Sequence, residues 1–135
     1  MTATPPLPRL TPESDFYWTG GAAGELRILR CRDCRHYAHP PTPLCRSCGS
    51  DDLAPEAVSG RGTVWTFTIS YQQLLPSLAT PYVVGIVELD EQSDLHVTTR
   101  LVDVDPDDVA VGMPVEVRFE RHDEVYLPLF APVAQ

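Results

Sequence analysis

Hydrophobic and polar residues alternate along much of the second half of the chain, and a period of two is typical of β-strands. From Gly60, the apolar side chains Trp65, Phe67, Ile69 and Tyr71 alternate with smaller or polar ones. This pattern predicts a strand with one apolar face, and we expect its aromatic rings to lie in a barrel core.

Residues 82–89 form a nearly continuous apolar run, typical of a strand buried on both faces, in which Gly85 indicates a bend or bulge. Further strands are predicted over three ranges: 95–101, 115–119 and 126–133. Prolines 128 and 132 favour an edge position for the last one, and residues 105–109 predict a single helical turn before the fourth strand. Five short strands arranged in this way are typical of the OB-fold barrel.

The first half of the chain lacks this alternation. Residues 1–10 are rich in proline, which indicates an extended tail. The run Thr11-Pro12-Glu13 predicts a helix start, with a capping hydroxyl, proline at the first position and an acid in the first turn. Three consecutive aromatic residues, 16–18, follow before glycines that keep the helix short. One or two of these rings are expected to pack on the core. Because three adjacent rings cannot all face one way on a helix, at least one should meet something else, and contact with a partner is the second interpretation.

Four cysteines between these two parts form two C-x2-C pairs: Cys31, Cys34, Cys45 and Cys48. This spacing lets each pair aim two sulfurs at one ion, so we predict a tetrahedral zinc site. Two disulfides are the alternative, which the paired spacing and the absence of a secretory signal disfavour. Four protein ligands close the coordination sphere, so the zinc is predicted to be structural and not catalytic. The nearby His36 and His39 are interpreted as surface or turn residues.

A short strand at 26–30 should enter this ribbon, residues 37–39 should return beside it, and residues 50–55 should form a polar exit. The predicted protein is thus mainly β. Its parts are an N-terminal tail and helical segment (1–25), a zinc ribbon (26–58) and an OB-fold (59–135).

The net charge of the chain indicates which class of partner it binds. The 135 residues carry a net charge of −9, and all ten basic residues are arginine. An acidic balance disfavours nucleic acid, whose binding is driven by contacts between basic side chains and phosphates. Five arginines nevertheless lie between residues 27 and 46, and Arg30 and Arg35 are candidates for holding the phosphates of coenzyme A. A solvated face that balances the thiolates is the alternative.

Location and catalysis are constrained by absences in the sequence. No apolar run is long enough to span a membrane, and residues 1–8 do not have the form of a secretory signal, so we expect a cytoplasmic protein. No hydrolase, protease, P-loop or dinucleotide motif occurs. His96 and His122 are interpreted as structural or solvated. We therefore expect no catalytic residues in this chain.

The ordered motifs resemble one family along residues 12–133. They are the aromatic-Trp segment, the two C-x2-C pairs separated by Pro40-Pro41, Ser59-Gly-Arg-Gly-Thr-Val64, Pro81-Tyr82 and Gly112-Met-Pro-Val115. The family joins a rubredoxin-like zinc ribbon to an OB-fold and is catalogued as domain of unknown function 35. The chain is similar to the C-terminal domain of a bacterial steroid side-chain hydratase subunit.

The resemblance implies a non-catalytic accessory subunit of a thiolase-like enzyme that acts on acyl-CoA thioesters, by retro-aldol cleavage of a steroid side-chain CoA ester. It implies a hetero-oligomer, two plus two, with the CoA thioester held mainly by the partner. Candidate interface residues are the exposed-looking aromatics Phe16, Tyr17, Trp18, Tyr126 and Phe130. The alternative is a stand-alone nucleic-acid binder with Trp65 and Tyr71 as a stacking platform.

Overall fold

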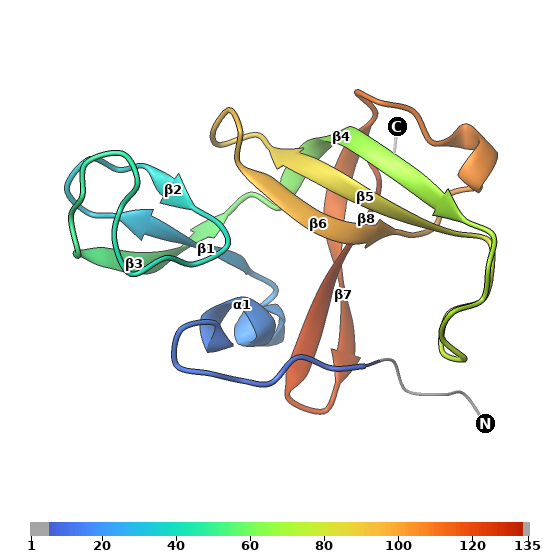
Figure 1. The fold of residues 1–135 in the computed structure, drawn as a ribbon, viewed down its shortest axis with the longest axis horizontal. Coiled ribbons are helices and arrows are strands. Elements are labelled where there is room, and N and C mark those ends of the chain that lie inside the picture. The colour runs from blue at the N-terminus through green and yellow to red at the C-terminus, as the bar shows by residue number, and fades with distance from the viewer. Residues whose placement is uncertain (1–5, 134–135) are drawn as a thin grey trace.

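The computed structural model describes residues 6–133 and shows a small ribbon beside a barrel, with a short helix beneath them (Figure 1). Residues 1–5 of the predicted tail and residues 134–135 of the predicted OB-fold lie outside the described residues. The N-terminal part contains α1 (Asp15–Thr19), the 3-10 helix η1 (Gly20–Ala23), β1 (Leu26–Cys31), β2 (Tyr37–Ala38) and β3 (Leu53–Val58). The barrel contains β4 (Arg61–Ser70), β5 (Tyr82–Leu89), β6 (His96–Leu101), the 3-10 helix η2 (Pro106–Asp108), β7 (Pro114–His122) and β8 (Val125–Pro132).

The barrel confirms the predicted fold class. Its strands close in the order β4-β5-β6-β8-β7, and the single turn η2 precedes the fourth of them. All pairs are antiparallel except β6 and β8, which run parallel and meet at Leu101 and Phe130. Closure gives every strand two neighbours, so β8 is not an exposed edge although it contains two prolines.

Alternate residues of the strands fill the barrel. Fully buried members of this core include Val64, Val83, Val87, Leu89, Leu95, Val97, Val115 and Phe130. The same cluster continues into the N-terminal part through Tyr17, Leu26, Ile28 and Tyr37. The base of the ribbon and the helix are therefore built onto the barrel and do not form a separate unit.

The prediction that Trp65 and Tyr71 lie in the barrel core is wrong. The register of β4 against β5 shifts between Val64 and Thr66, so that Trp65 occupies a bulge and its side chain turns outward. Trp65 is 51% exposed and Tyr71 is 71% exposed, whereas Val64 is buried. A strict alternation read from the sequence does not anticipate the extra residue, which reverses the inward and outward positions beyond it.

Gly85 does not mark a bulge. It keeps regular register with Phe67 on one side and Thr99 on the other. A Cβ atom at this position would lie 3.1 Å from the Leu101 side chain. The absence of a side chain at Gly85 thus leaves room for the Leu101 side chain. The bulge of the barrel lies at Trp65 instead.

The helix begins three residues later than predicted, at Asp15 and not at Pro12. The carbonyl of Thr11 accepts hydrogen bonds from the N–H groups of both Ser14 and Asp15, which forms a turn ahead of the helix. After η1, Gly21 packs so tightly on β8 that an added Cβ would meet the Tyr126 side chain. This contact fixes the helical segment against the β7–β8 hairpin.

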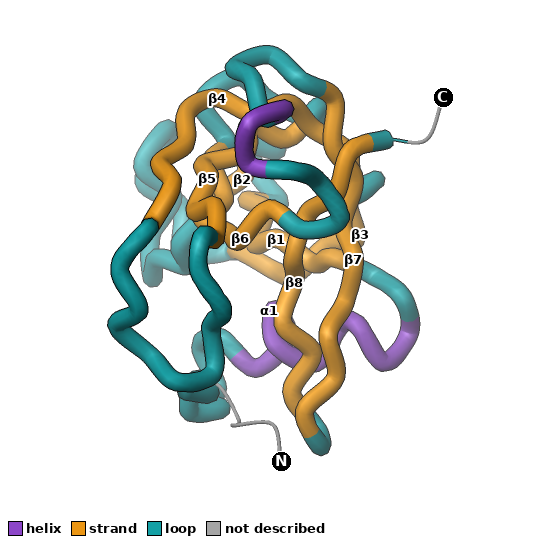
Figure 2. The backbone as a smooth tube through the Cα atoms, turned by 90° about the vertical axis from the view of Figure 1, so that its right-hand side faces the viewer, coloured by secondary structure: helices purple, strands orange, loops and turns teal. Residues whose placement is uncertain are grey.

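The ribbon is a three-stranded sheet in the order β2-β1-β3. The polar exit predicted for residues 50–55 is wrong in its second half, because β3 pairs with the whole of β1 from Leu26 to Cys31. Figure 2 shows the ribbon behind the barrel when the molecule is turned by 90°. No helix among residues 6–133 is long and apolar enough to cross a membrane.

Candidate metal centre and neighbouring surfaces

The four cysteines converge at the tip of the ribbon. Cys31 ends β1 and is buried, as is Cys45, while Cys34 and Cys48 are exposed. All four sulfur atoms lie within 4.8 Å of one another, and neither His36 nor His39 belongs to the group. Each C-x2-C pair thus contributes one inner and one outer thiol.

The distances fit a metal and exclude disulfides. The Sγ atoms of Cys31 and Cys48 are 3.6 Å apart, and those of Cys34 and Cys45 are 3.5 Å apart. A disulfide requires about 2.05 Å. Four sulfurs at about 2.3 Å from a tetrahedral zinc ion lie about 3.8 Å from one another. The residues present fit a structural zinc ion.

The two pairs are built alike. The N–H of Arg35 donates to the carbonyl of Cys31 at 3.0 Å, and the N–H of Gly49 donates to the carbonyl of Cys45 at 2.8 Å. Both of these residues have positive φ angles, 69° for Arg35 and 78° for Gly49. Each turn therefore returns the chain in the left-handed conformation just after the second cysteine.

Backbone groups favour the thiolate form at the inner cysteines. The N–H of Cys34 points at the Cys31 sulfur at 3.5 Å and lowers the pKa of Cys31 to about 6. The N–H of Cys48 likewise lowers the pKa of Cys45. A zinc ion binds thiolates, so these donors prepare the site for the metal.

Arg30 and Arg35 lie side by side, but Glu56 of β3 already pairs with both. Arg30 donates to Glu56 at 3.0 Å and to the carbonyl of Arg35 at 2.8 Å, and its guanidinium lies 4.3 Å from the centre of the Tyr37 ring. Arg35 lies 3.3 Å from the same carboxylate. Sequence reasoning did not identify Glu56, because no strand was predicted over residues 53–58.

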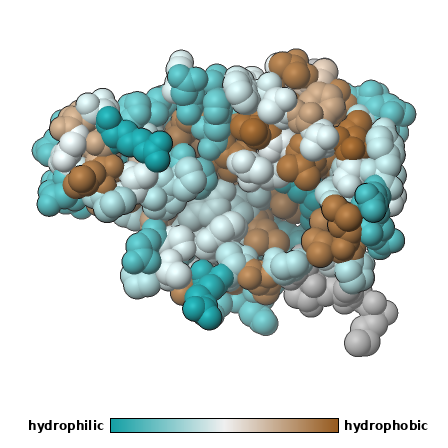
Figure 3. All heavy atoms as spheres, viewed as in Figure 1, coloured by the Kyte–Doolittle hydropathy of each residue, from teal (hydrophilic) through white to brown (hydrophobic). Residues whose placement is uncertain are grey.

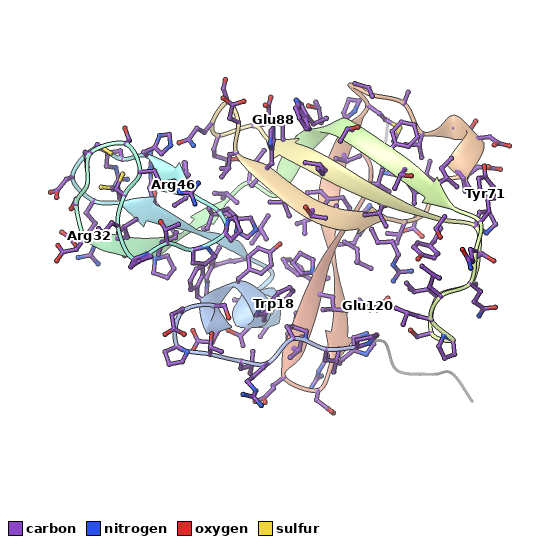
Figure 4. All side chains as sticks on the ribbon, in the orientation of Figure 1. Trp18, Arg32, Arg46, Tyr71, Glu88 and Glu120 are labelled. Atoms are coloured by element: carbon purple, nitrogen blue, oxygen red, sulfur yellow. The ribbon has the colours of Figure 1, made fainter. Side chains whose placement is uncertain are left out.

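The predicted interface aromatics divide into two groups. Tyr17 and Phe130 are only 5% and 0% exposed, so the expectation that they lie on the surface is wrong. They belong to the core because α1 turns Tyr17 toward the barrel and β8 turns Phe130 inward. Phe16, Trp18 and Tyr126 are half-buried; Trp18, which packs edge-on against Tyr17, is labelled beneath the ribbon in Figure 4.

His39, expected at the surface or in a turn, lies in the bend after β2 and is half-buried. Its ring stacks on Tyr17 with a centroid separation of 4.8 Å, and its Nδ1 is buried without a hydrogen-bond partner among the described residues. Burial lowers the pKa of His39 to about 4 and raises that of Tyr17 above its usual range. His39 is therefore neutral at pH 7 and packs the ribbon against the helix.

Two further features lie outside the metal centre. A groove of about 460 Å³ between α1 and the ribbon is lined by Phe16, Leu29, Leu53 and several prolines. On the barrel, Glu88, Asp94 and His96 gather within 4.8 Å. Glu88 accepts the N–H of Asp94 at 3.1 Å and lies 3.5 Å from the His96 ring, so contacts within the turn account for this cluster.

Comparisons with known proteins agree with this architecture. Residues 18–54 match the family described as the rubredoxin-like zinc ribbon domain of ChsH2, and residues 55–120 match the C-terminal OB-fold domain of ChsH2. A DUF35 domain-containing scaffold protein of Methanocaldococcus jannaschii is 33% identical over 100 residues, which cover 71% of this chain and 68% of that protein.

A longer relative matches this chain over only about a third of its own length. The 3-oxo-4,17-pregnadiene-20-carboxyl-CoA hydratase alpha subunit of Mycobacterium tuberculosis is 35% identical over 112 residues, which cover 83% of this chain but only 35% of that subunit. A solved structure named Ltp2-ChsH2(DUF35) aldolase contains a chain that is 32% identical with a TM-score of 0.85. The match covers 95% of the present chain and all of that chain.

Proposed function

The chain belongs to the DUF35 family, whose members join a zinc ribbon to an OB-fold, and on that premise we propose that it is a non-catalytic accessory subunit of a thiolase-like enzyme acting on acyl-CoA thioesters. The observation that carries the proposal is the full-length likeness to the DUF35 chain of a two-component aldolase. The match covers all of that chain, so a ribbon and barrel of this kind make up the whole of it.

The chemistry of the described residues supports an accessory role. The four thiols fit a closed metal site, which leaves no position for a substrate or a water. Two tyrosines are buried outside that site: Tyr17 stacks on the half-buried His39 between helix and ribbon, and Tyr37 lies under the Arg30 guanidinium. Glu88 and His96 form a carboxylate–histidine pair, and His96 lines a cavity of about 370 Å³, but Glu88 already accepts the N–H of Asp94, so we assign no catalytic role to this pair.

The reaction proposed for the complex is retro-aldol cleavage of a steroid side-chain CoA ester. The hydroxyl on the β-carbon loses its proton and becomes a ketone. The bond between the α- and β-carbons breaks, and its electron pair forms the thioester enolate, which takes up a proton to give a shorter acyl-CoA. The partner supplies the groups that move these protons, and no step requires an oxidant.

Within the complex we assign two further roles. Phe16, Trp18 and Tyr126, which keep exposed surface, contact the partner, and two copies of each subunit assemble. Arg30 and Arg35 bind the phosphates of CoA. This requires some of their ion pairs with Glu56 to break. Charge reversal at both arginines should then weaken the affinity of the complex for CoA esters, and an unchanged affinity would rule out this role.

The test is co-purification with the thiolase-like protein encoded beside this chain, followed by an aldol-cleavage assay on 3-hydroxyacyl-CoA esters. We expect a stable complex whose activity exceeds that of either protein alone. A zinc-loaded chain that does not bind the thiolase-like protein would contradict the proposal.

A further inference from the structure

One long stretch of the chain carries no charge. Residues 62–87 contain no aspartate, glutamate, arginine or histidine, although 29 charged residues are distributed over the rest of the 135. Burial explains part of this, because β4 and β5 line the barrel. It does not explain the connection between them, residues 71–81, in which most side chains are exposed.

This β4–β5 loop presents large apolar groups to solvent. Tyr71 is 71% exposed and Leu74 is 66% exposed, and Trp65 on the adjoining strand is 51% exposed. These are three of only six exposed large hydrophobic side chains among residues 6–133. Figure 3 shows brown, hydrophobic residues over the barrel side, and Figure 4 places Tyr71 at the far end of the barrel from the ribbon.

Acidic residues lie at the same end of the barrel as the loop. The segment around η2 contains Asp103, Asp105, Asp107 and Asp108. Figure 2 shows η2 and the β4–β5 loop at the same end of the barrel, the end that faces the viewer. An uncharged, aromatic centre with a charged border is the composition of a protein–protein interface, where charges are depleted at the core and retained at the rim.

The distribution of charge also indicates which class of molecule binds the β4–β5 loop. A nucleic acid would need cations near the rings, but residues 62–87 contain none. Of the four barrel arginines, Arg100 and Arg118 are paired with glutamates. A second copy of the chain would bring two bodies of charge −9 together, which self-repulsion opposes. A different protein with an apolar patch and a basic border fits both features.

We propose that the β4–β5 loop, with Tyr71 and Leu74 as its anchors, is a docking site for the catalytic subunit. This inference rests on the proposed function, and it adds a second contact surface to the one assigned above to Phe16, Trp18 and Tyr126. The acidic border should speed association and make it sensitive to salt, while the two apolar side chains supply the affinity.

The experiment measures binding of the purified thiolase-like protein to immobilised chain. The double variant Tyr71→Glu with Leu74→Glu places two charges on a surface that must lose its water when the partner binds. We expect its affinity for the partner to fall at least tenfold. The matched control is Leu44→Glu, which alters a side chain that is 54% exposed in the ribbon loop. Zinc content and circular dichroism equal to those of the wild type verify that each variant is folded.

The outcomes separate the two proposals. If the wild type binds and the double variant binds equally well, or if Leu44→Glu weakens binding as much, the docking site is overturned while the accessory role stands. If the wild type does not bind, the proposed function fails. Light scattering and titration with an oligothymidine then follow. A homodimer or a single-strand complex lost in the double variant would reassign the surface and overturn the inference.

Discussion

The tip of the ribbon and the barrel are stabilised in different ways. Among residues 32–52 only Tyr37 and Cys45 are buried, and Cys45 is a predicted metal ligand. The barrel instead encloses a continuous apolar core that includes Val87, Val97 and Phe130. The tip therefore depends on a few strong bonds to one ion, and the barrel on many weak contacts. The loss of a single group should consequently have a local effect in one region and a global effect in the other.

The largest effect is expected from the metal centre. Zinc binding contributes on the order of 10–16 kcal/mol to the folding of small zinc domains. The substitution Cys45→Ser should release the zinc and unfold residues 32–52 while the barrel stays folded. Metal analysis and amide NMR spectra check this: ribbon signals should collapse to random-coil positions and barrel signals should stay.

The control for this variant is Ser47→Ala, which changes a residue inside the same turn that provides no ligand. It should retain zinc and the native spectrum. Loss of the barrel signals in Cys45→Ser would show that the two regions are not independent, and that the continuity of the core through Leu26 and Ile28 transmits the damage.

The second effect is expected in the barrel. Phe130 is fully buried and pairs β8 with both β6 and β7. Replacing Phe130→Ala leaves a cavity and should lower the free energy of unfolding by about 3–5 kcal/mol, measured in urea. The zinc content of the folded fraction should not change. Phe130→Leu is the control and should lose much less, and a loss below about 1 kcal/mol for the alanine variant would contradict the description of the core.

How far the sequence predicts the molecule also differs between the two regions. Ligand identity follows from spacing alone, because the four cysteines need only two short turns to meet, and the structure brings their sulfurs together. To predict which barrel residues point inward, one needs the strand register, which depends on pairing between strands distant in sequence. The bulge at Trp65 comes from such pairing, so alternation predicted the strand and the core contacts of Phe67 and Ile69 but misplaced Trp65.

Contacts between regions were the least predictable. The stacking of His39 on Tyr17 is one example, because nothing nearby in sequence indicates that two residues more than twenty positions apart meet. Glu56 was missed for the same reason. The uncharged stretch of residues 62–87, in contrast, is visible in the sequence alone, but only the structure shows that part of it is an exposed loop.

The third effect depends on pH and reports on the junction between the two regions. The pKa of His39 is about 4 in the folded chain and about 6.5 in an unfolded one. Between these values the unfolded state binds a proton that the folded state does not. The stabilisation is thus complete above pH 6.5 and is lost as the pH falls toward 4. This linkage should cost about 2 kcal/mol at pH 5 relative to pH 7.

Urea unfolding at both pH values checks the size of this effect. His39→Phe keeps a ring on Tyr17 but does not titrate, so its loss of stability between pH 7 and pH 5 should be smaller than that of the wild type by this amount. Protonation of the zinc ligands affects both proteins alike and cancels in the difference. His36→Gln, at an exposed position, is the control and should behave as the wild type does. Equal losses for His39→Phe and the wild type would show that His39 does not titrate as a buried group.

The smallest effect is expected at the ribbon arginines, and it separates structure from ligand binding. Arg35 is 54% exposed and pairs with a carboxylate that is itself 39% exposed, so Arg35→Ala should cost less than about 1 kcal/mol of stability in urea. Arg30, only 24% exposed, also stacks on Tyr37, so Arg30→Ala should cost more. Arg35→Ala is therefore the better probe of CoA affinity in the complex. A weaker affinity at unchanged stability would assign Arg35 to the ligand. An unchanged affinity would leave it as part of the solvated face around Glu56.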